Sequence, residues 1–244
     1  MASLAFAALL AFACLVGADA LRAEPASNAS GLKLVRVDFF VMSLCPDTAW
    51  CDQVFGPVLE AIADKVPLNV QYTFLAEVEN GLACKHGGKE CVGNRWGLCA
   101  QEAAAGDVKQ LVRFFRCQTY NQSGIPDNGP HCSMEAGINV TSMRSCVASN
   151  HSRDLMEESA KSAIALGIED TCIVKLNRQP FCTHDGGRWK DCDTCGDDKA
   201  ECLYNALTAL ADPALAQKSS SVRMRLRSEI AFLLVGSMVL SLWR

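Results

Sequence analysis

The residues of this 244-residue chain with the clearest chemical potential are its 14 cysteines. Cys45 is the most informative, because it follows an apolar segment, residues 32–42, and precedes Pro46 and a segment with helical spacing. The start of a helix favours negative charge through its unpaired N–H groups and its dipole, and so favours a thiolate. We therefore predict that Cys45 is a nucleophile in thiol–disulfide exchange. A structural half-cystine at the end of a strand is the alternative.

A dithiol oxidoreductase carries a second, resolving cysteine three residues after the nucleophile, and here that position is Thr48. The next cysteine is Cys51. In one regular helix Cys45 and Cys51 would lie about 9 Å apart along the axis, which exceeds disulfide reach. A bond between them requires residues 45–48 to form a loop. We predict Cys45 and Cys51 as the catalytic residues, with an external small thiol as the alternative resolving group. The Thr48 hydroxyl could donate a hydrogen bond to the thiolate but cannot resolve a mixed disulfide.

A second group of reactive side chains lies within residues 84–99. Its members are Cys84, His86, Gly87, Glu90, Cys91, Asn94 and Cys99. Thiols, a histidine and a carboxylate at this spacing could bind zinc. In an oxidising compartment disulfides are the better reading, and we expect neither a metal nor a cofactor. A separate C-x-x-C, Cys192 to Cys195, lies among acidic residues that disfavour a thiolate, so we interpret it as structural.

The elements that would position Cys45 form a strand, helix and strand. Residues 32–42 and 68–75 are typical of buried strands, and residues 49–66 place valines and an isoleucine at intervals of four, which indicates one helical stripe. Pro57 inside that stripe predicts a kink. Such a βαβ unit favours parallel pairing of its strands.

The rest of the body supplies helices and a second strand pair. We predict a Gly- and Cys-rich loop at 83–99, helices at 98–117, 134–148, 155–166 and 198–211, a strand at 173–176 and a hairpin at 178–187. This order indicates an α/β fold: a thioredoxin-like core spanning residues 31–212, with a disulfide-rich helical insertion at about 83–152.

The cysteine count indicates the compartment. Cys14 lies in a predicted signal peptide, residues 1–20, which leaves 13 cysteines in the mature chain, a density typical of oxidising compartments. Their odd number leaves at least one thiol free or paired outside the chain. Four N-x-S/T sequons fit the secretory route and predict that residues 121–152 face solvent. They are at Asn28, Asn121, Asn139 and Asn150.

The carboxyl end, residues 219–244, combines small residues, a short polar spacer and an apolar tail. This is the pattern of a GPI-anchor signal, and a short membrane anchor or a plain tail are the alternatives. The net charge of −4, without a basic stripe, argues against a nucleic-acid partner.

Residues 84–99 match the pattern C-x-H-G-x-x-E-C-x-x-N-x-x-x-x-C, which resembles the signature of the gamma-interferon-inducible lysosomal thiol reductase (GILT) family. The similarity extends over about residues 33–205. It implies a thioredoxin-like fold, a secretory or endolysosomal location and reduction of protein disulfides, often at acid pH. The family's usual active site is C-x-x-C or C-x-x-S, whereas this chain has Cys-Pro-Asp-Thr from Cys45. The fold's usual cis-proline has no counterpart near Thr171 and Cys172. The signature residues His86, Glu90 and Asn94 are expected to shape their segment rather than catalyse.

Three hypotheses follow. In the first, Cys45 reduces protein disulfides through a mixed disulfide, with a small thiol as reductant, in the secretory pathway, at the cell surface or in a lysosome or vacuole. In the second, the protein is a catalytically impaired, disulfide-stapled secreted or surface glycoprotein with the same fold. In the third, it is a metal-binding module.

Overall fold

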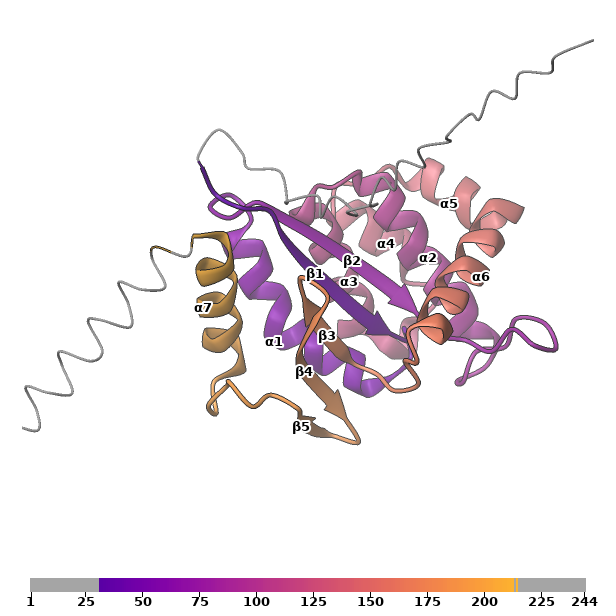
Figure 1. Cartoon of the computed structure of the whole chain (residues 1–244). Coiled ribbons are helices and arrows are strands. Elements are labelled where there is room, and N and C mark those ends of the chain that lie inside the picture. Colours follow the sequence, from indigo (N-terminus) through magenta and orange to yellow (C-terminus); the bar gives the residue numbers. More distant parts are fainter. Residues whose placement is uncertain (1–30, 213, 215–244) are drawn as a thin grey trace, which may run out of the picture.

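A computed structural model describes residues 31–212 and 214 of the chain (Figure 1). The predicted signal peptide at 1–20, the sequon at Asn28 and the predicted tail at 219–244 lie outside these residues. Within the described part of the chain, no helix is both long enough and apolar enough to cross a membrane.

The first elements form the strand–helix–strand unit that the sequence predicts. They are β1 (Val35–Val41), α1 (Pro46–Ile62) and β2 (Leu68–Phe74). β1 and β2 pair in parallel over all seven of their residues, which confirms the expected βαβ unit. α1 starts with Pro46, a position where the missing N–H has no helical partner to lose. Pro57 lies inside α1, and the kink predicted there stays a prediction.

The remaining strands add to the other edge of β1. They are β3 (Ile173–Leu176), β4 (Gln179–Asp185) and β5 (Arg188–Lys190). All three are antiparallel to their neighbours, so the sheet order is β2-β1-β3-β4-β5. Two-residue turns with positive φ connect them, Asn177-Arg178 and Gly186-Gly187, which is the geometry that matches strand twist. The predicted strand and hairpin are confirmed.

The last helix completes a thioredoxin-like fold. α7 (Lys199–Ala211) starts after Asp198, whose carboxylate accepts a hydrogen bond from the Glu201 N–H at 2.9 Å. It packs against α1. A parallel β1–α1–β2 unit followed by an antiparallel β3–β4 pair and a closing helix is the thioredoxin-like arrangement that the sequence predicts.

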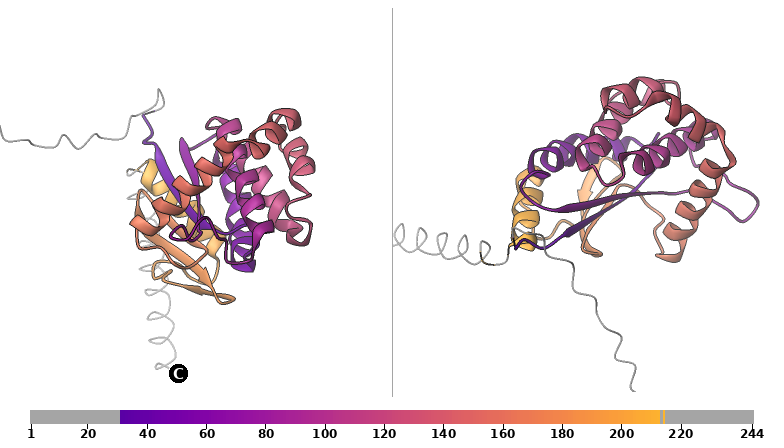
Figure 2. Two further views of the ribbon diagram at one scale, coloured as in Figure 1. Left: turned by 90° about the vertical axis from the view of Figure 1, so that its right-hand side faces the viewer. Right: turned by 90° about the horizontal axis from the view of Figure 1, so that it is seen from above.

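Between β2 and β3 the chain forms a helical group that packs beside the sheet (Figure 2). Its members are α2 (Gly88–Ala104), α3 (Val108–Tyr120), a short 3-10 helix, η1 (Gln122–Gly124), α4 (Gly129–Glu135), α5 (Val140–Ala148) and α6 (Asn150–Ala165). Side-chain caps start three of them, because Asp107, Asn139 and Ser149 each accept a hydrogen bond from a backbone N–H three residues ahead.

Three predictions in this region are wrong. The expected loop at 83–99 is helical from Gly88 onward, and the single helix expected at 98–117 is two helices, α2 and α3. The helix expected at 134–148 is interrupted, because α4 ends at Glu135 and α5 starts at Val140. Inside α2, at Gly93 and Gly97, neighbouring side chains leave no room for a Cβ. At Gly97 a Cβ would lie 2.5 Å from the Phe74 ring. The break between the helices falls at Ala105 and Gly106, which both have positive φ.

Aromatic rings join the sheet to the helical group. The Phe39 ring of β1 stacks on Tyr72 of β2 at 4.8 Å between centroids, and Tyr72 stacks on Phe115 of α3 at 3.7 Å. All three are fully or almost fully buried. The two-residue period of the strands places these rings on one face, so the core lies between the sheet and α1 with α3.

Six disulfides fasten the fold within the described residues. The pairs are Cys51–Cys172, Cys84–Cys91, Cys99–Cys146, Cys117–Cys132, Cys182–Cys192 and Cys195–Cys202. Cys172 and Cys182 lie close in sequence but are bonded to Cys51 and Cys192 rather than to each other. The C-x-x-C cysteines, Cys192 and Cys195, are bonded to different partners, which agrees with a structural role.

The three described sequon asparagines, Asn121, Asn139 and Asn150, are all exposed. Their neighbourhood also supplies buried side chains such as Ile125 and Met143. The prediction of a solvent-facing segment thus holds for the acceptor asparagines and not for every residue. Glycosylation itself stays a prediction.

Candidate active site

Cys45 lies where β1 ends and α1 starts, at the N-cap of the helix. It is the only free cysteine of the described residues, and 7% of its surface is exposed. The first N–H groups of α1 and the helix dipole face this end, which favours negative charge on the sulfur. The structure therefore places the predicted nucleophile at a helix start, as the sequence indicated.

Two residues of the signature hold the backbone just before Cys45. The Ser43 N–H donates to Asn94 Oδ1 at 2.9 Å, and the Leu44 N–H donates to Glu90 Oε2 at 3.3 Å. Both acceptors are completely buried side chains of α2. Their spacing of four places them on one face of that helix. Glu90 and Asn94 thus position the loop that carries the predicted nucleophile, a more specific role than the shaping of their own segment that the sequence predicted.

His86 and a disulfide fix this part of α2 in turn. His86 Nδ1 lies 2.5 Å from Glu90 Oε2, and the His86 N–H donates to Glu90 Oε1 at 3.2 Å. The Cys84–Cys91 bond closes the turn that precedes the helix. At Gly87 the φ of 86° is one that a side chain disfavours. The cysteines once considered as zinc ligands are consumed here and in Cys99–Cys146.

Gln122 is a site residue that the sequence analysis missed. Its Nε2 donates to the Cys45 carbonyl at 2.8 Å and to the Ser43 carbonyl at 3.0 Å. Asn94 and Glu90 accept hydrogen bonds from two N–H groups of this loop, and Gln122 donates to two of its carbonyl groups, so both kinds of backbone group have partners. The sequence distance of 77 residues leaves no local signal for this contact, although Gln122 is the middle residue of the Asn121 sequon.

A second missed feature is an acid–histidine pair beside the thiol. The Cys45 thiol donates to Asp47 Oδ2 at 3.9 Å, and His184 Nδ1 lies 2.7 Å from Asp47 Oδ1. A carboxylate only accepts, so the His184 Nδ1 carries the proton in this contact. The N–H groups of Gly186 and Gly187 donate to the same carboxylate at 3.2 and 3.0 Å. Asp47 therefore ties Cys45 to the β4–β5 turn, whose Gly186 is 139 residues from Asp47 in sequence.

His184 is buried and held by aromatic rings. Its ring lies 5.9 Å from the Trp50 ring and 4.7 Å, edge to face, from the Trp189 ring. Trp50 is 53% exposed, so it forms an accessible apolar surface close to the pair. Backbone hydrogen bonds in both directions also join His184 to Cys172.

Cys51 is not brought together with Cys45. It is fully buried and bonded to Cys172, at a sequence separation of 121. The helix starts directly after Cys45, which is the case in which the sequence argument excludes a Cys45–Cys51 bond. Cys51 thus sits in a structural bridge, and no redox pair with Cys45 is formed.

Thr48 also has a different partner from the one considered. Its Oγ1 accepts a hydrogen bond from the Met42 N–H at 3.2 Å, and its side chain is buried. The position where the fold usually has a cis-proline holds a cis peptide bond between Thr171 and Cys172.

Comparison with known proteins finds a family model that matches part of the chain. A family model described as gamma interferon inducible lysosomal thiol reductase (GILT) matches residues 36–136. GILT-like protein 1 of Drosophila melanogaster is 28% identical over 151 residues, which cover 54% of this chain and 60% of that protein. The chain is thus similar to the GILT family over residues 36–136. The match spans less than two thirds of the length of that curated relative.

Solved structures similar to this chain include bacterial disulfide oxidoreductases. The reduced form of a disulfide bond oxidoreductase, DsbG, from Mycobacterium tuberculosis is 18% identical, with 65% of this chain and 76% of that chain covered and a TM-score of 0.47. MdbA, a thiol-disulfide oxidoreductase from Corynebacterium diphtheriae, is 12% identical, with 60% and 77% covered and a TM-score of 0.46.

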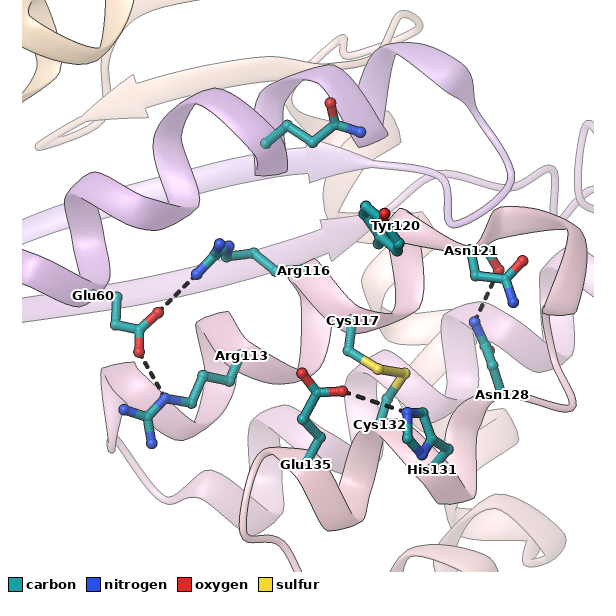
Figure 3. A pocket seen from close by; sticks show the side chains of 11 residues that line it. Glu60, Arg113, Arg116, Cys117, Tyr120, Asn121, Asn128, His131, Cys132 and Glu135 are labelled. Atoms are coloured by element: carbon teal, nitrogen blue, oxygen red, sulfur yellow. Dashed lines mark hydrogen bonds and ion pairs between the residues drawn. A yellow bond between two sulfur atoms is a disulfide. The ribbon is translucent and has the colours of Figure 1, made fainter.

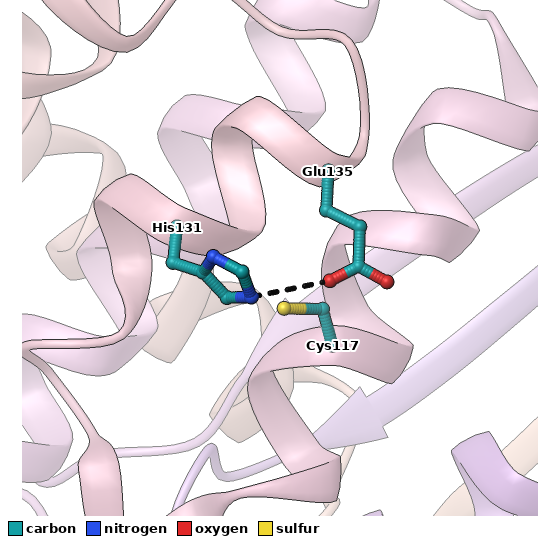
Figure 4. Close-up of side chains that lie close together, drawn as sticks. All are labelled: Cys117, His131 and Glu135. Atoms are coloured by element: carbon teal, nitrogen blue, oxygen red, sulfur yellow. Dashed lines mark ion pairs between the residues drawn. The ribbon is translucent and has the colours of Figure 1, made fainter.

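Two other features of the chain lie away from Cys45. A polar pocket of about 1050 Å³ opens between α1, α3 and α4, where Arg113 and Arg116 both bind Glu60 (Figure 3). On one wall Cys117, His131 and Glu135 gather as metal ligands would (Figure 4). Cys117 is bonded to Cys132 and offers no thiolate, and the other two are exposed. This set does not fit a metal centre.

Proposed function

We propose that this protein is a thiol oxidoreductase of the GILT family that reduces protein disulfides through Cys45, with a small thiol as reductant. One observation carries the proposal: Cys45, the one free thiol of the described residues, lies at the start of a helix. Its loop is held by hydrogen bonds with the buried side chains of Asn94 and Glu90 and with Gln122. Four side-chain hydrogen bonds hold the backbone around this thiol, two to the N–H groups of Ser43 and Leu44 and two to the carbonyls of Ser43 and Cys45. The other twelve cysteines of the described residues are consumed in disulfides.

The first step is attack of the Cys45 thiolate on one sulfur of a substrate disulfide. A new bond forms between Cys45 and that sulfur, the substrate disulfide breaks, and the other substrate sulfur leaves as a thiolate that takes up a proton. Asp47 accepts the hydrogen bond of the Cys45 thiol, so in this proposal it is the group that receives the thiol proton. His184, on the opposite oxygen, stabilises that carboxyl group.

The second step must use a thiol from outside the chain. Thr48 has no sulfur, and Cys51 is bonded to Cys172. One molecule of a small thiol attacks the mixed disulfide, which releases the substrate as its second thiol and leaves the small thiol bonded to Cys45. A second molecule then restores the Cys45 thiol. The substrate disulfide gains two electrons, and two small thiols become one disulfide.

The compartment we propose is the secretory pathway or a lysosome-type organelle. Six disulfides require an oxidising route during synthesis. Three exposed sequons are compatible with that route. Membrane attachment through residues 219–244 remains part of this proposal.

The test is reduction of a protein disulfide by the mature chain with glutathione or cysteine as reductant. The proposal expects turnover that requires the small thiol and is lost in Cys45→Ser. A control, Ser145→Ala, changes an exposed residue of α5 and should leave the rate unchanged. If the intact protein and Cys45→Ser give the same rate over pH 4–8, the protein is the non-catalytic, disulfide-stapled glycoprotein of the second hypothesis.

A further inference from the structure

An apolar groove lies between the loop that follows β2 and the end of α6. Its volume is about 570 Å³. The loop projects beyond the carboxyl end of β2, beside α6 (Figure 1). The groove's apolar lining includes Met42, Leu75, Ala163, Ile164 and Ile168.

This groove shares its apolar residues with the surroundings of Cys45. Met42, Leu75 and Ala163 line the groove, and the same three residues form one buried cluster with Cys45 and Phe40. Ile168 lines the groove and packs against that cluster. Cys45 and the groove therefore contact the same packed cluster of apolar side chains. Ile164, 53% exposed, extends the apolar surface outward from it.

The rim of the groove is acidic. Glu77, Glu79 and Glu169 line it and are exposed, and no ion pair within residues 31–212 uses any of the three. The single cation of the rim, Lys85, lies near Asp185 of β4 and helps to lower the pKa of that carboxyl, after the larger effect of Lys190. The apolar floor therefore carries a net negative rim.

We propose that the groove binds an extended segment of the substrate polypeptide that combines apolar side chains with Lys or Arg, adjacent to the disulfide that Cys45 attacks. The inference rests on the proposed function and adds a substrate preference to it. Apolar side chains remove surface from water on the floor formed by Leu75 and Ile168. Basic side chains meet Glu77, Glu79 and Glu169, and this attraction weakens with salt because all three carboxylates are exposed.

The test measures binding apart from chemistry. The Cys45→Ser protein is titrated into two fluorescein-labelled twelve-residue peptides, in which Ser replaces Cys. Both carry Leu and Phe, and they differ only in having three Lys or three Glu. We expect the Lys peptide to bind about tenfold more tightly at low salt. That preference should disappear when Glu77→Gln, Glu79→Gln and Glu169→Gln are combined. The control combines Asp127→Asn, Asp154→Asn and Glu158→Gln, which remove three exposed charges that do not line the groove.

Equal affinity for both peptides, or a preference that survives the rim triple variant, would overturn the groove assignment. A protein that reduces disulfides without this preference refutes the groove alone. A protein that shows the preference but reduces no disulfide refutes the proposed function and leaves the groove standing.

Discussion

Asp52 is a completely buried carboxyl group on α1, next in sequence to the Cys51–Cys172 bond. The Tyr72 hydroxyl donates to its Oδ1 at 3.1 Å, whereas no hydrogen bond is formed by Oδ2. Burial raises the pKa of Asp52 from 3.8 to about 7, against the opposing effects of the Tyr72 hydroxyl, the Thr119 hydroxyl and the positive charge of Arg116. The folded protein thus keeps this group protonated where the unfolded chain ionises it.

The sign of the pH effect follows from proton binding. A folded-state pKa above the unfolded one means that the folded state binds more protons between about pH 4 and 7, so stability falls as pH rises through this window. With about 1.4 kcal/mol for each unit of pKa difference, the full penalty above pH 7 is about 4 kcal/mol. Of this, about 2–3 kcal/mol is lost between pH 5 and pH 8.

Asp52→Asn removes the ionisation and keeps the shape of the side chain. We expect the difference in free energy of unfolding between the variant and the wild type to shift by about 2–3 kcal/mol in favour of the variant when the pH changes from 5 to 8. The assay is urea unfolding at both pH values. Tyr72→Phe is the matched control, because it removes the hydrogen bond that lowers the pKa of Asp52 and should steepen the pH dependence. Equal pH dependence in the wild type and Asp52→Asn would refute the reasoning.

Three further predictions concern the nucleophile and its support. Thr48→Cys should release the reduced substrate without the small thiol, because the introduced thiol can attack the mixed disulfide. Peptide mapping after one turnover should then find a disulfide between Cys45 and residue 48. Asn94→Ala leaves a buried N–H of the nucleophile loop unpaired, so we expect a loss of about 1–3 kcal/mol in stability and slower alkylation of Cys45, measured by mass spectrometry. Replacing both Cys51 and Cys172 with Ala should cost up to about 5 kcal/mol, because that bond closes a 121-residue separation, while Cys45 keeps its reactivity in the folded protein.

Each of these has a control and a contrary result. For the disulfide, the matched pair is Cys84→Ala with Cys91→Ala, whose separation of 7 residues predicts about 2 kcal/mol. A larger loss from this short bridge would contradict the loop-length argument. For Asn94, unchanged alkylation would show that the loop does not need its hydrogen bond. For Thr48, continued dependence on the small thiol at the wild-type level would contradict the resolving argument.

The sequence predicts the βαβ unit and the place of Cys45 because apolar periodicity and Pro46 are local signals. It misplaces α2 because glycines usually indicate loops. Here Gly93 and Gly97 serve close packing, and a Cβ at Gly93 would lie 2.6 Å from the Ser43 Oγ. That contact depends on the folded arrangement and leaves no trace in local pattern.

The remaining site residues could not be found from spacing. Asp47 and His184 are 137 residues apart and meet only because β4 and β5 form a hairpin beside the start of α1. Gln122 reaches Cys45 across 77 residues. The partner of Cys51 was also unpredictable, because cysteine counts do not fix connectivity.

The most direct test of the account is exposure of the folded protein to glutathione disulfide, followed by peptide mapping without reduction. The account predicts one glutathione, bonded to Cys45, which forms under native conditions and is removed by added glutathione, with the Cys51–Cys172 bond intact. A Cys45 that stays unmodified until the protein is unfolded, or an adduct on Cys51 or Cys172 instead, would contradict it.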